Sequence, residues 1–121
     1  MNYLKFTRFL KHDFEKSNQK FNSIKFFRSE LVLIFIWFWV LENYYRSKEN
    51  LSYKSNVETL VSEIPKGLGS RPTIFKFIEQ AIASKFIIKI IDPEDKRKWN
   101  LRPSEQTIQE FEEWSNGFSG Y

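Results

Sequence analysis

The sequence contains no cysteine, and histidine and methionine occur once each among its 121 residues. Without cysteine the chain forms no disulfide, no thiolate zinc site and no cysteine nucleophile, which fits a reducing cytosol. The single histidine, His12, lies in a basic segment and is interpreted as a solvated surface group. No serine triad or metal cluster can be assembled around it. We therefore expect no enzyme, no metal site and no cofactor.

Long hydrophobic runs are also missing. The longest apolar stretch, residues 31–41, is 11 residues long, whereas a membrane-spanning helix needs about 18 or more. The first 28 residues carry charges throughout and contain no unbroken apolar segment of the kind found in signal peptides. We expect a cytoplasmic protein that associates with the nucleoid and not with a membrane.

Aromatic and basic side chains are abundant. The chain of 121 residues is long enough for one domain with a core, and aromatic residues, which make up 18% of it, should fill that core. The net charge is +4, and Lys/Arg outnumber Asp/Glu by seven to two in residues 1–28 and by nine to four in residues 66–102. Residues 103–121 hold four Glu and no Lys or Arg. Basic patches are the electrostatic footprint of a polyanion-binding protein. We expect a basic amphipathic arm over residues 1–28 and the main domain over residues 29–121.

The arm carries Tyr3, Phe6, Leu10 and Phe14 at helical spacing, with Lys and Arg between them. This pattern predicts an amphipathic helix that ends near residues 17–18. Its apolar face needs a surface that covers it, and the sequence allows three alternatives. These are the chain's own domain, a second chain that exchanges arms in a dimer, and a membrane surface.

The apolar run lies in a second predicted helix, residues 30–46, with Ser29 or Ser23 as its N-cap. Because residues 31–41 are apolar on all sides, the helix should be enclosed on most faces, and its aromatic side chains are interpreted as core. The polar residues 47–54 predict a loop.

A helix-turn-helix is predicted next. Its first helix opens at Ser55-Asn56, carries Val57, Leu60, Val61 and Ile64 on one face, and ends at residues 65–69. Ser70 is the N-cap of the second helix, and Pro72 lies in the first turn, where its missing N–H costs little. Two helices joined by a glycine-containing turn form this motif. The turn lacks the Lys of a P-loop and the third Gly of a dinucleotide fingerprint, so we do not interpret it as a nucleotide site.

The second helix of the motif has distinct faces at about 100° per residue. Its inner side carries Ile74, Phe77, Ile78 and Ala81, with Ile82 at the margin. Its outer side carries Pro72, Lys76, Glu79 and Ala83, flanked by Thr73, Phe75 and Gln80. A small polar face of this kind fits the major groove, where Lys76 can donate to guanine and Gln80 can pair with adenine.

A basic hairpin follows. Residues 86–91 are rich in Ile and predict a strand, residues 92–98 a turn, and residues 99–101 a returning strand. The tip carries Lys96, Arg97 and Lys98. Arg97 is placed to enter an A·T-rich minor groove with Asp95 holding it, and an ordinary charged tip is the alternative.

The chain closes with a predicted helix that begins at residues 103–105. Its inner residues are Ile108, Phe111 and Trp114. Its acidic residues are interpreted as a solvated face and not as paired catalytic carboxylates: Glu105, Glu110, Glu112 and Glu113.

The order of these features resembles the winged helix-turn-helix of the MarR family over about residues 55–115. The matching positions are residues 70–74, Lys76, the strand, residues 92–97, Leu101 and residues 103–105. The resemblance implies a mainly α-helical fold with a small β-hairpin wing, and a transcriptional regulator that binds DNA as a homodimer on a palindromic site. It also implies that the helix with Thr73 and Lys76 reads the major groove, whereas Arg97, braced by Asp95, reaches the minor groove.

The chain departs from that family pattern in two places. The turn at residues 65–69 is about three residues longer than usual, and the part after Ser104 is short for helices that hold a dimer. Family members also bind small aromatic effectors, but the sequence identifies neither a pocket nor an effector.

We therefore expect a regulator that binds double-stranded DNA in a sequence-specific manner. Arg71 and Lys98, and also Lys66, would contact phosphates, while Phe75 would meet a thymine methyl group. The expected DNA-binding residues are Arg71, Pro72, Thr73, Phe75, Lys76, Gln80, Lys96, Arg97 and Lys98, with Asp95 supporting the wing. The alternative is a winged helix used for protein–protein contact, because a fold does not fix a function.

Overall fold

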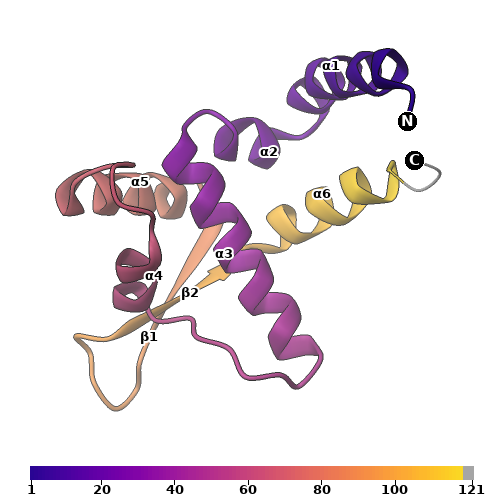
Figure 1. Cartoon of the computed structure of the whole chain (residues 1–121). Helices are drawn as coiled ribbons and strands as arrows, with labels where there is room; N and C mark the ends of the chain where they lie inside the picture. Colours follow the sequence, from indigo (N-terminus) through magenta and orange to yellow (C-terminus); the bar gives the residue numbers. More distant parts are fainter. Residues whose placement is uncertain (119–121) are drawn as a thin grey trace.

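The computed structural model describes residues 1–118, which form six helices and one two-stranded antiparallel sheet (Figure 1). In chain order they are α1 (Tyr3–Lys20), α2 (Asn22–Phe27), α3 (Leu31–Lys48), α4 (Val57–Glu63), α5 (Arg71–Ala83), β1 (Ile87–Ile91), β2 (Trp99–Pro103) and α6 (Glu105–Asn116). The order of α4, α5, the hairpin and α6 is that of a winged helix-turn-helix. The predicted fold class, mainly α-helical with a small β-hairpin wing, is confirmed.

Helix α3 runs through the middle of the molecule and organises the core (Figure 1). Trp37 is 1% exposed, and its ring centroid lies 6.0 Å from that of Phe27 on α2 and 5.8 Å from that of Phe111 on α6. Leu31 and Phe38 are instead 69% and 56% exposed, so α3 is enclosed on most faces but not on all. Although α3 is apolar, no helix within residues 1–118 is both long and apolar enough to cross a membrane.

The start of α3 differs from the prediction. Its N-cap is Glu30, whose side chain makes no capping hydrogen bond, so the expected cap by Ser29 or Ser23 is wrong. The Ser29 hydroxyl donates to the carbonyl of Phe26. Ser23 lies inside the additional short helix α2, and its hydroxyl donates to Glu110. Both hydroxyls therefore have other partners and neither reaches the first turn of α3.

Both helices of the helix-turn-helix begin where predicted, and the N-cap predicted at Ser70 is confirmed. The Asn56 side chain accepts a hydrogen bond from the Glu58 N–H at 2.8 Å, and the Ser70 hydroxyl accepts one from the Thr73 N–H at 3.4 Å. Gly67 in the intervening turn has φ +96°, a conformation that glycine adopts without steric cost. The residues that α5 buries are Ile74, Ile78 and Ala81, with Phe77 and Ile82 half-buried, as predicted.

The wing is a short hairpin joined to the start of α4. Its register runs from the pair Ile87 and Pro103 to the pair Ile91 and Trp99, which confirms the predicted strands and extends the second by two residues. The Leu101 N–H donates to the carbonyl of Ser55 at 2.8 Å. This bond fixes the base of the wing against the helix-turn-helix.

Helices α1 and α6 lie at the end of the molecule away from α5 and the hairpin (Figure 1). The Trp114 indole N–H donates to both carboxylate oxygens of Asp13, at 3.0 and 3.1 Å. The Arg28 guanidinium lies 4.8 Å from the ring centroid of Phe14 and 3.8 Å from Asp13. Burial lowers the pKa of Arg28, and the charge of Asp13 opposes this shift. These contacts hold the middle and C-terminal part of α1 against the domain.

The apolar face of α1 is only partly covered by the chain's own domain. Tyr3, Phe6, Leu10 and Phe14, which the sequence placed on this face, are 75%, 40%, 46% and 52% exposed. The helix continues to Lys20, slightly beyond the predicted end. Of the three covering surfaces considered above, the chain's own domain therefore covers only part of this face.

Helix α6 begins within the predicted residues 103–105, and its N-cap is Ser104, whose hydroxyl accepts a hydrogen bond from the Thr107 N–H at 3.2 Å. The interpretation of its acidic side chains as a solvated face is wrong for Glu110. That carboxylate is half-buried and accepts hydrogen bonds from the N–H and the hydroxyl of Ser23, at 2.9 and 2.5 Å. It ties α6 to α2, so its role is structural.

Candidate nucleic-acid interface

Helix α5 presents a polar outer face because its apolar residues are held in the core. The exposed residues on this face are Pro72, Lys76, Glu79, Gln80 and Ala83, with Thr73 and Phe75 half-buried. Lys76 and Gln80 are four residues apart and are therefore neighbours on the helix surface. A donor and an amide on one turn match the acceptor and donor pattern of base edges in a major groove.

Arg71 at the first position of α5 is held from two sides. Its Nη2 atom donates to both carboxylate oxygens of Glu58 on α4, at 2.7 and 2.9 Å. Its guanidinium carbon also lies 4.9 Å from the ring centroid of Phe75, one turn further along α5. The hydrogen bond to Arg71 lowers the pKa of the Glu58 carboxyl, and the same bond raises the pKa of Arg71. The charge of this phosphate-contact candidate is thus balanced by a neighbouring carboxylate.

Phe75 packs toward the wing as well as beneath Arg71. Its ring centroid lies 6.3 Å from that of Trp99 on β2, at an interplanar angle of 50°. The Lys89 ammonium on β1 lies 4.0 Å from the centroid of the Trp99 ring. Four side chains from α5, β2 and β1 thus follow one another across the junction of helix and wing.

The wing tip holds Arg97 against Asp95. The Asp95 carboxylate accepts hydrogen bonds from the Arg97 N–H at 3.0 Å, from its Nε at 3.2 Å and from its Nη2 at 3.4 Å. The side-chain bond, followed by the backbone bond, lowers the pKa of Asp95. The Arg97 side chain remains 91% exposed. This geometry braces an arginine while leaving it accessible, as a minor-groove contact requires.

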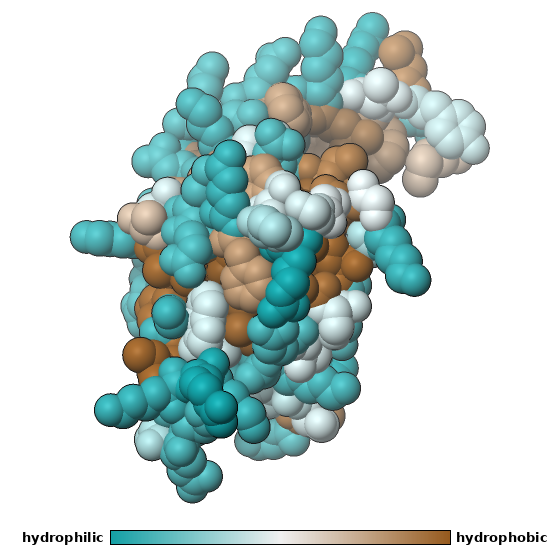
Figure 2. Space-filling model, turned by 90° about the vertical axis from the view of Figure 1, so that its left-hand side faces the viewer, coloured by the Kyte–Doolittle hydropathy of each residue, from teal (hydrophilic) through white to brown (hydrophobic). Residues whose placement is uncertain are grey.

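Helix α5 and the wing hairpin lie on the same side of the molecule (Figure 1). Viewed from that side, hydrophilic side chains cover most of the surface and form the protrusion at its lower end, with apolar side chains visible between them (Figure 2). The cations Lys66, Lys76, Lys96 and Lys98 are all exposed. The elements that carry the sequence-derived candidates, α5 and the wing, therefore lie on one side of the molecule.

Sequence reasoning missed two members of this face, Glu58 and Lys89. Glu58 lies in the first turn of α4 and reaches Arg71 only because the turn returns α5 beside α4. Lys89 is the single charged residue of the apolar strand β1. Its position among isoleucines could have predicted its contact with Trp99, because a lysine in an apolar strand needs either solvent or an aromatic partner.

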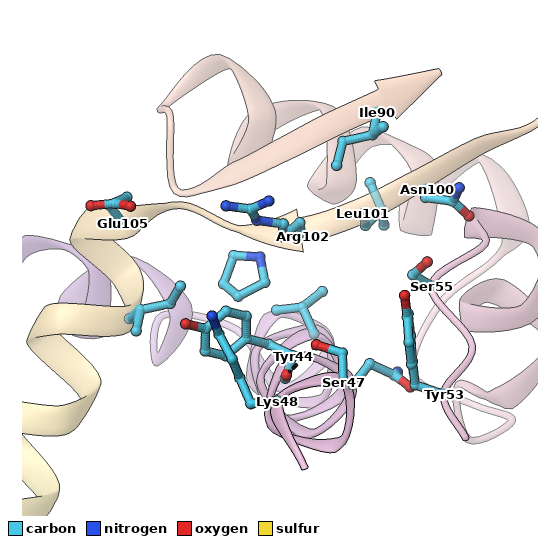
Figure 3. A pocket seen from close by; sticks show the side chains of 14 residues that line it. Tyr44, Ser47, Lys48, Tyr53, Ser55, Ile90, Asn100, Leu101, Arg102 and Glu105 are labelled. Carbon is cyan, nitrogen blue, oxygen red and sulfur yellow. Dashed lines mark hydrogen bonds between the residues drawn. The ribbon is translucent and has the colours of Figure 1, made fainter. Parts of the chain in front are cut away.

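A cavity of about 520 Å³ lies on another part of the molecule, between α3, the base of the wing and the start of α6 (Figure 3). Tyr44, Ser47 and Lys48 on α3 face Leu101 and Arg102 on β2 across it. Its lining also includes Tyr53, Ser55, Asn100 and Glu105. The sequence had indicated no pocket. Among residues 1–118, no three His, Cys, Asp or Glu side chains gather closely enough to hold a metal ion.

Comparison with known proteins gives one structural likeness. No protein-family model and no curated protein matches the sequence. The chain is similar to a mutant of MepR from S. aureus, with a TM-score of 0.47 and 19% sequence identity over 98% of this chain and 77% of that chain. A likeness at this TM-score and identity says nothing about function, so the function is inferred from the chain's own geometry.

Proposed function

We propose that this protein is a transcriptional regulator that binds double-stranded DNA in a sequence-specific manner. Helix α5 enters the major groove, where Thr73, Lys76 and Gln80 face base edges. The Arg97 side chain enters the minor groove and Asp95 holds it there. Lys96, Lys98 and Lys66 contact phosphates of the DNA. Arg71 and Pro72, at the start of α5, lie beside the DNA backbone. The order of elements and the MarR-like positions in the sequence support this assignment.

One observation carries the proposal. Helix α5 and the basic wing lie on the same side of the molecule, whereas α6, with its acidic residues, lies on the other side (Figure 1). A duplex that contacts α5 and the wing is thus kept away from the acidic helix. Lys and Arg on one face, with an arginine at a hairpin tip, form the charge distribution expected for a groove-binding module.

The exposed apolar face of α1 supports a homodimer. Burying large apolar side chains on association releases about 25 cal/mol for each Å² removed from water. Five such side chains on α1 are 40% exposed or more, and Leu31 and Phe38 on α3 are also exposed. We propose that α1 of a second copy covers this surface. A two-fold dimer would present two α5 helices to two half-sites of a palindrome.

Selection of genomic fragments tests the proposed function. Immobilised protein is mixed with sheared genomic duplex DNA, washed at increasing salt, and the retained fragments are sequenced. A shared, two-fold symmetric sequence motif in the retained fragments is expected. Retention without any common motif would reduce the function to nonspecific DNA binding, and absence of retention at low salt would refute it.

A protein-binding role is the second candidate, because β1 exposes apolar side chains. Ile88, Ile90 and Ile91 are 41%, 41% and 54% exposed, and an exposed apolar strand can pair with a partner. Replacing Ile88 and Ile90 with Thr distinguishes the two roles. Fragment retention should persist in that variant if DNA binding is the function.

A further inference from the structure

The junction of α5 and the wing contains a continuous array of side chains, Glu58, Arg71, Phe75, Trp99 and Lys89. The Glu58 carboxylate pairs with Arg71, Arg71 lies on the ring of Phe75, Phe75 contacts Trp99, and Lys89 lies on Trp99. These five residues come from α4, α5, β2 and β1. The array connects every element that the proposed function places on DNA.

The two cations of the array differ in their electrostatic environment. Arg71 is balanced by the Glu58 carboxylate at 2.7 Å. Lys89 has no carboxylate within ion-pairing distance among residues 1–118, and its one close partner is the face of Trp99. An aromatic face attracts the ammonium without neutralising its charge. Lys89 therefore supplies the uncompensated positive charge of the array.

Trp99 also restricts where that charge lies. A lysine side chain has many rotamers, and ordering it costs conformational entropy. The Nζ atom of Lys89 is held 4.0 Å from the centroid of the Trp99 ring, and the position of that ring is set in turn by Phe75 of α5. The ammonium is thus held at the junction between helix and wing before any ligand binds.

We propose that Lys89 is a further DNA contact, which binds a backbone phosphate at the junction of α5 and the wing, and that Trp99 is its positioning residue. This inference rests on the proposed function, since it assigns a contact within the same interface. A phosphate is the expected partner because a lysine ammonium is a point charge that recognises phosphate without reading sequence. The array thereby adds affinity at the junction, while Lys76 and Gln80 supply base recognition.

The first test compares Lys89→Gln with Lys25→Gln. Both variants lose one positive charge, and Lys25 is an exposed residue of α2, outside the array. Fluorescence anisotropy on a random-sequence duplex is measured over a series of about 50 to 200 mM salt. Loss of one phosphate contact should weaken Lys89→Gln binding about eightfold at 0.1 M salt and flatten the salt slope by about 0.9. Lys25→Gln should bind like the wild type.

The second test asks whether Trp99 acts through Lys89. In a Trp99→Leu background, Lys89→Gln should weaken binding by less than about threefold, since the two residues are coupled. The Trp99→Phe variant retains an aromatic ring. In that background, Lys89→Gln should again weaken binding by most of the factor seen in the wild type. Each variant is first shown to melt cooperatively, so that a folding defect is recognised separately.

The outcomes separate the inference from the proposed function. If the wild type binds with a steep salt slope and Lys89→Gln binds equally well, the inference is overturned and the proposed function stands. An undiminished Lys89→Gln effect in the Trp99→Leu background would overturn the positioning role of Trp99. Absence of duplex binding by the wild type would overturn both proposals together.

Discussion

The Nη2 atom of Arg71 donates to both carboxylate oxygens of Glu58, at 2.7 and 2.9 Å, across the turn between α4 and α5. A carboxylate therefore lies beside the residue at the start of α5 that was expected to contact DNA. Both side chains are exposed, so solvent screens the pair and its contribution to folding is small. Its larger consequence concerns the electrostatic attraction between this face and a phosphate backbone.

Replacing Glu58 with Gln should strengthen duplex binding. The substitution removes a negative charge next to the DNA face and leaves the Arg71 charge uncompensated. We expect about fivefold tighter binding at 0.1 M salt and a steeper salt slope, measured by anisotropy on random-sequence duplex. Glu63→Gln on the same helix is the matched control for charge. Weaker binding by Glu58→Gln would instead show that Glu58 orients Arg71 productively.

Lys76 and Lys98 should differ in what they contribute. Neutralising Lys76 with Gln should cost about 1 to 3 kcal/mol on a selected site and relax base preference at one position, because Lys76 faces base edges. Neutralising Lys98 should weaken all sequences alike and flatten the salt slope by about one, as for a phosphate contact. Competition between a selected site and scrambled duplex measures both. Equal loss of discrimination in the two variants would refute this division of roles.

Leu10→Glu should convert the proposed dimer to a monomer. Leu10 is 46% exposed in the single chain, so a charge there is tolerated by the fold but is costly inside an apolar interface. Light scattering at several protein concentrations measures the mass. Lys11→Gln, on the same helix and with the same change in charge, should leave the dimer intact. If the wild type and Leu10→Glu have the same mass, the interface lies elsewhere.

Alkaline pH should destabilise the fold through Tyr45. Burial, and then the hydrogen bond donated to Glu112 at 3.1 Å, raise the pKa of Tyr45 to about 12. A tyrosine in an unfolded chain has a pKa of about 10. The neutral form therefore contributes stability that is complete below about pH 10 and is lost as the pH rises toward 12.

Urea unfolding at pH 9 and pH 11.5 measures this dependence. The free energy of unfolding should fall more between these pH values in the wild type than in Tyr45→Phe. Tyr53→Phe is the control, because Tyr53 is 52% exposed on a loop. The same loss of stability in Tyr45→Phe and the wild type would assign the alkaline sensitivity to other groups.

Local signals in the sequence identified the helix-turn-helix and the wing. Ser70 was predicted as an N-cap, and helix starts were predicted at Asn56 and Ser104, because an N-cap bonds to N–H groups two or three residues away. The isoleucine content of residues 86–91 predicted the first strand of the wing, and the run of charged residues predicted its tip. These are interactions between residues that are close in the chain, where spacing is informative.

What the sequence did not predict depends on distant residues. Ser23 bonds to Glu110, 87 positions away, so neither the missing cap of α3 nor the burial of Glu110 had a local signal. The placement of Phe75 against Trp99, and of Lys89 on Trp99, required the relative position of α5 and the wing. The pairing of Arg71 with Glu58 likewise depends on how the long turn at residues 65–69 brings α5 back to α4.

The most direct test of the central claim is fluorescence anisotropy of the wild-type protein on duplex DNA over a salt series of about 50 to 200 mM. Fragments retained in the selection and random-sequence duplex of equal length are compared at each salt concentration. We expect binding to both that weakens steeply with salt, with the selected fragments still bound at the highest concentration. Lack of binding to either DNA at 50 mM salt would contradict the assignment of this winged helix to DNA.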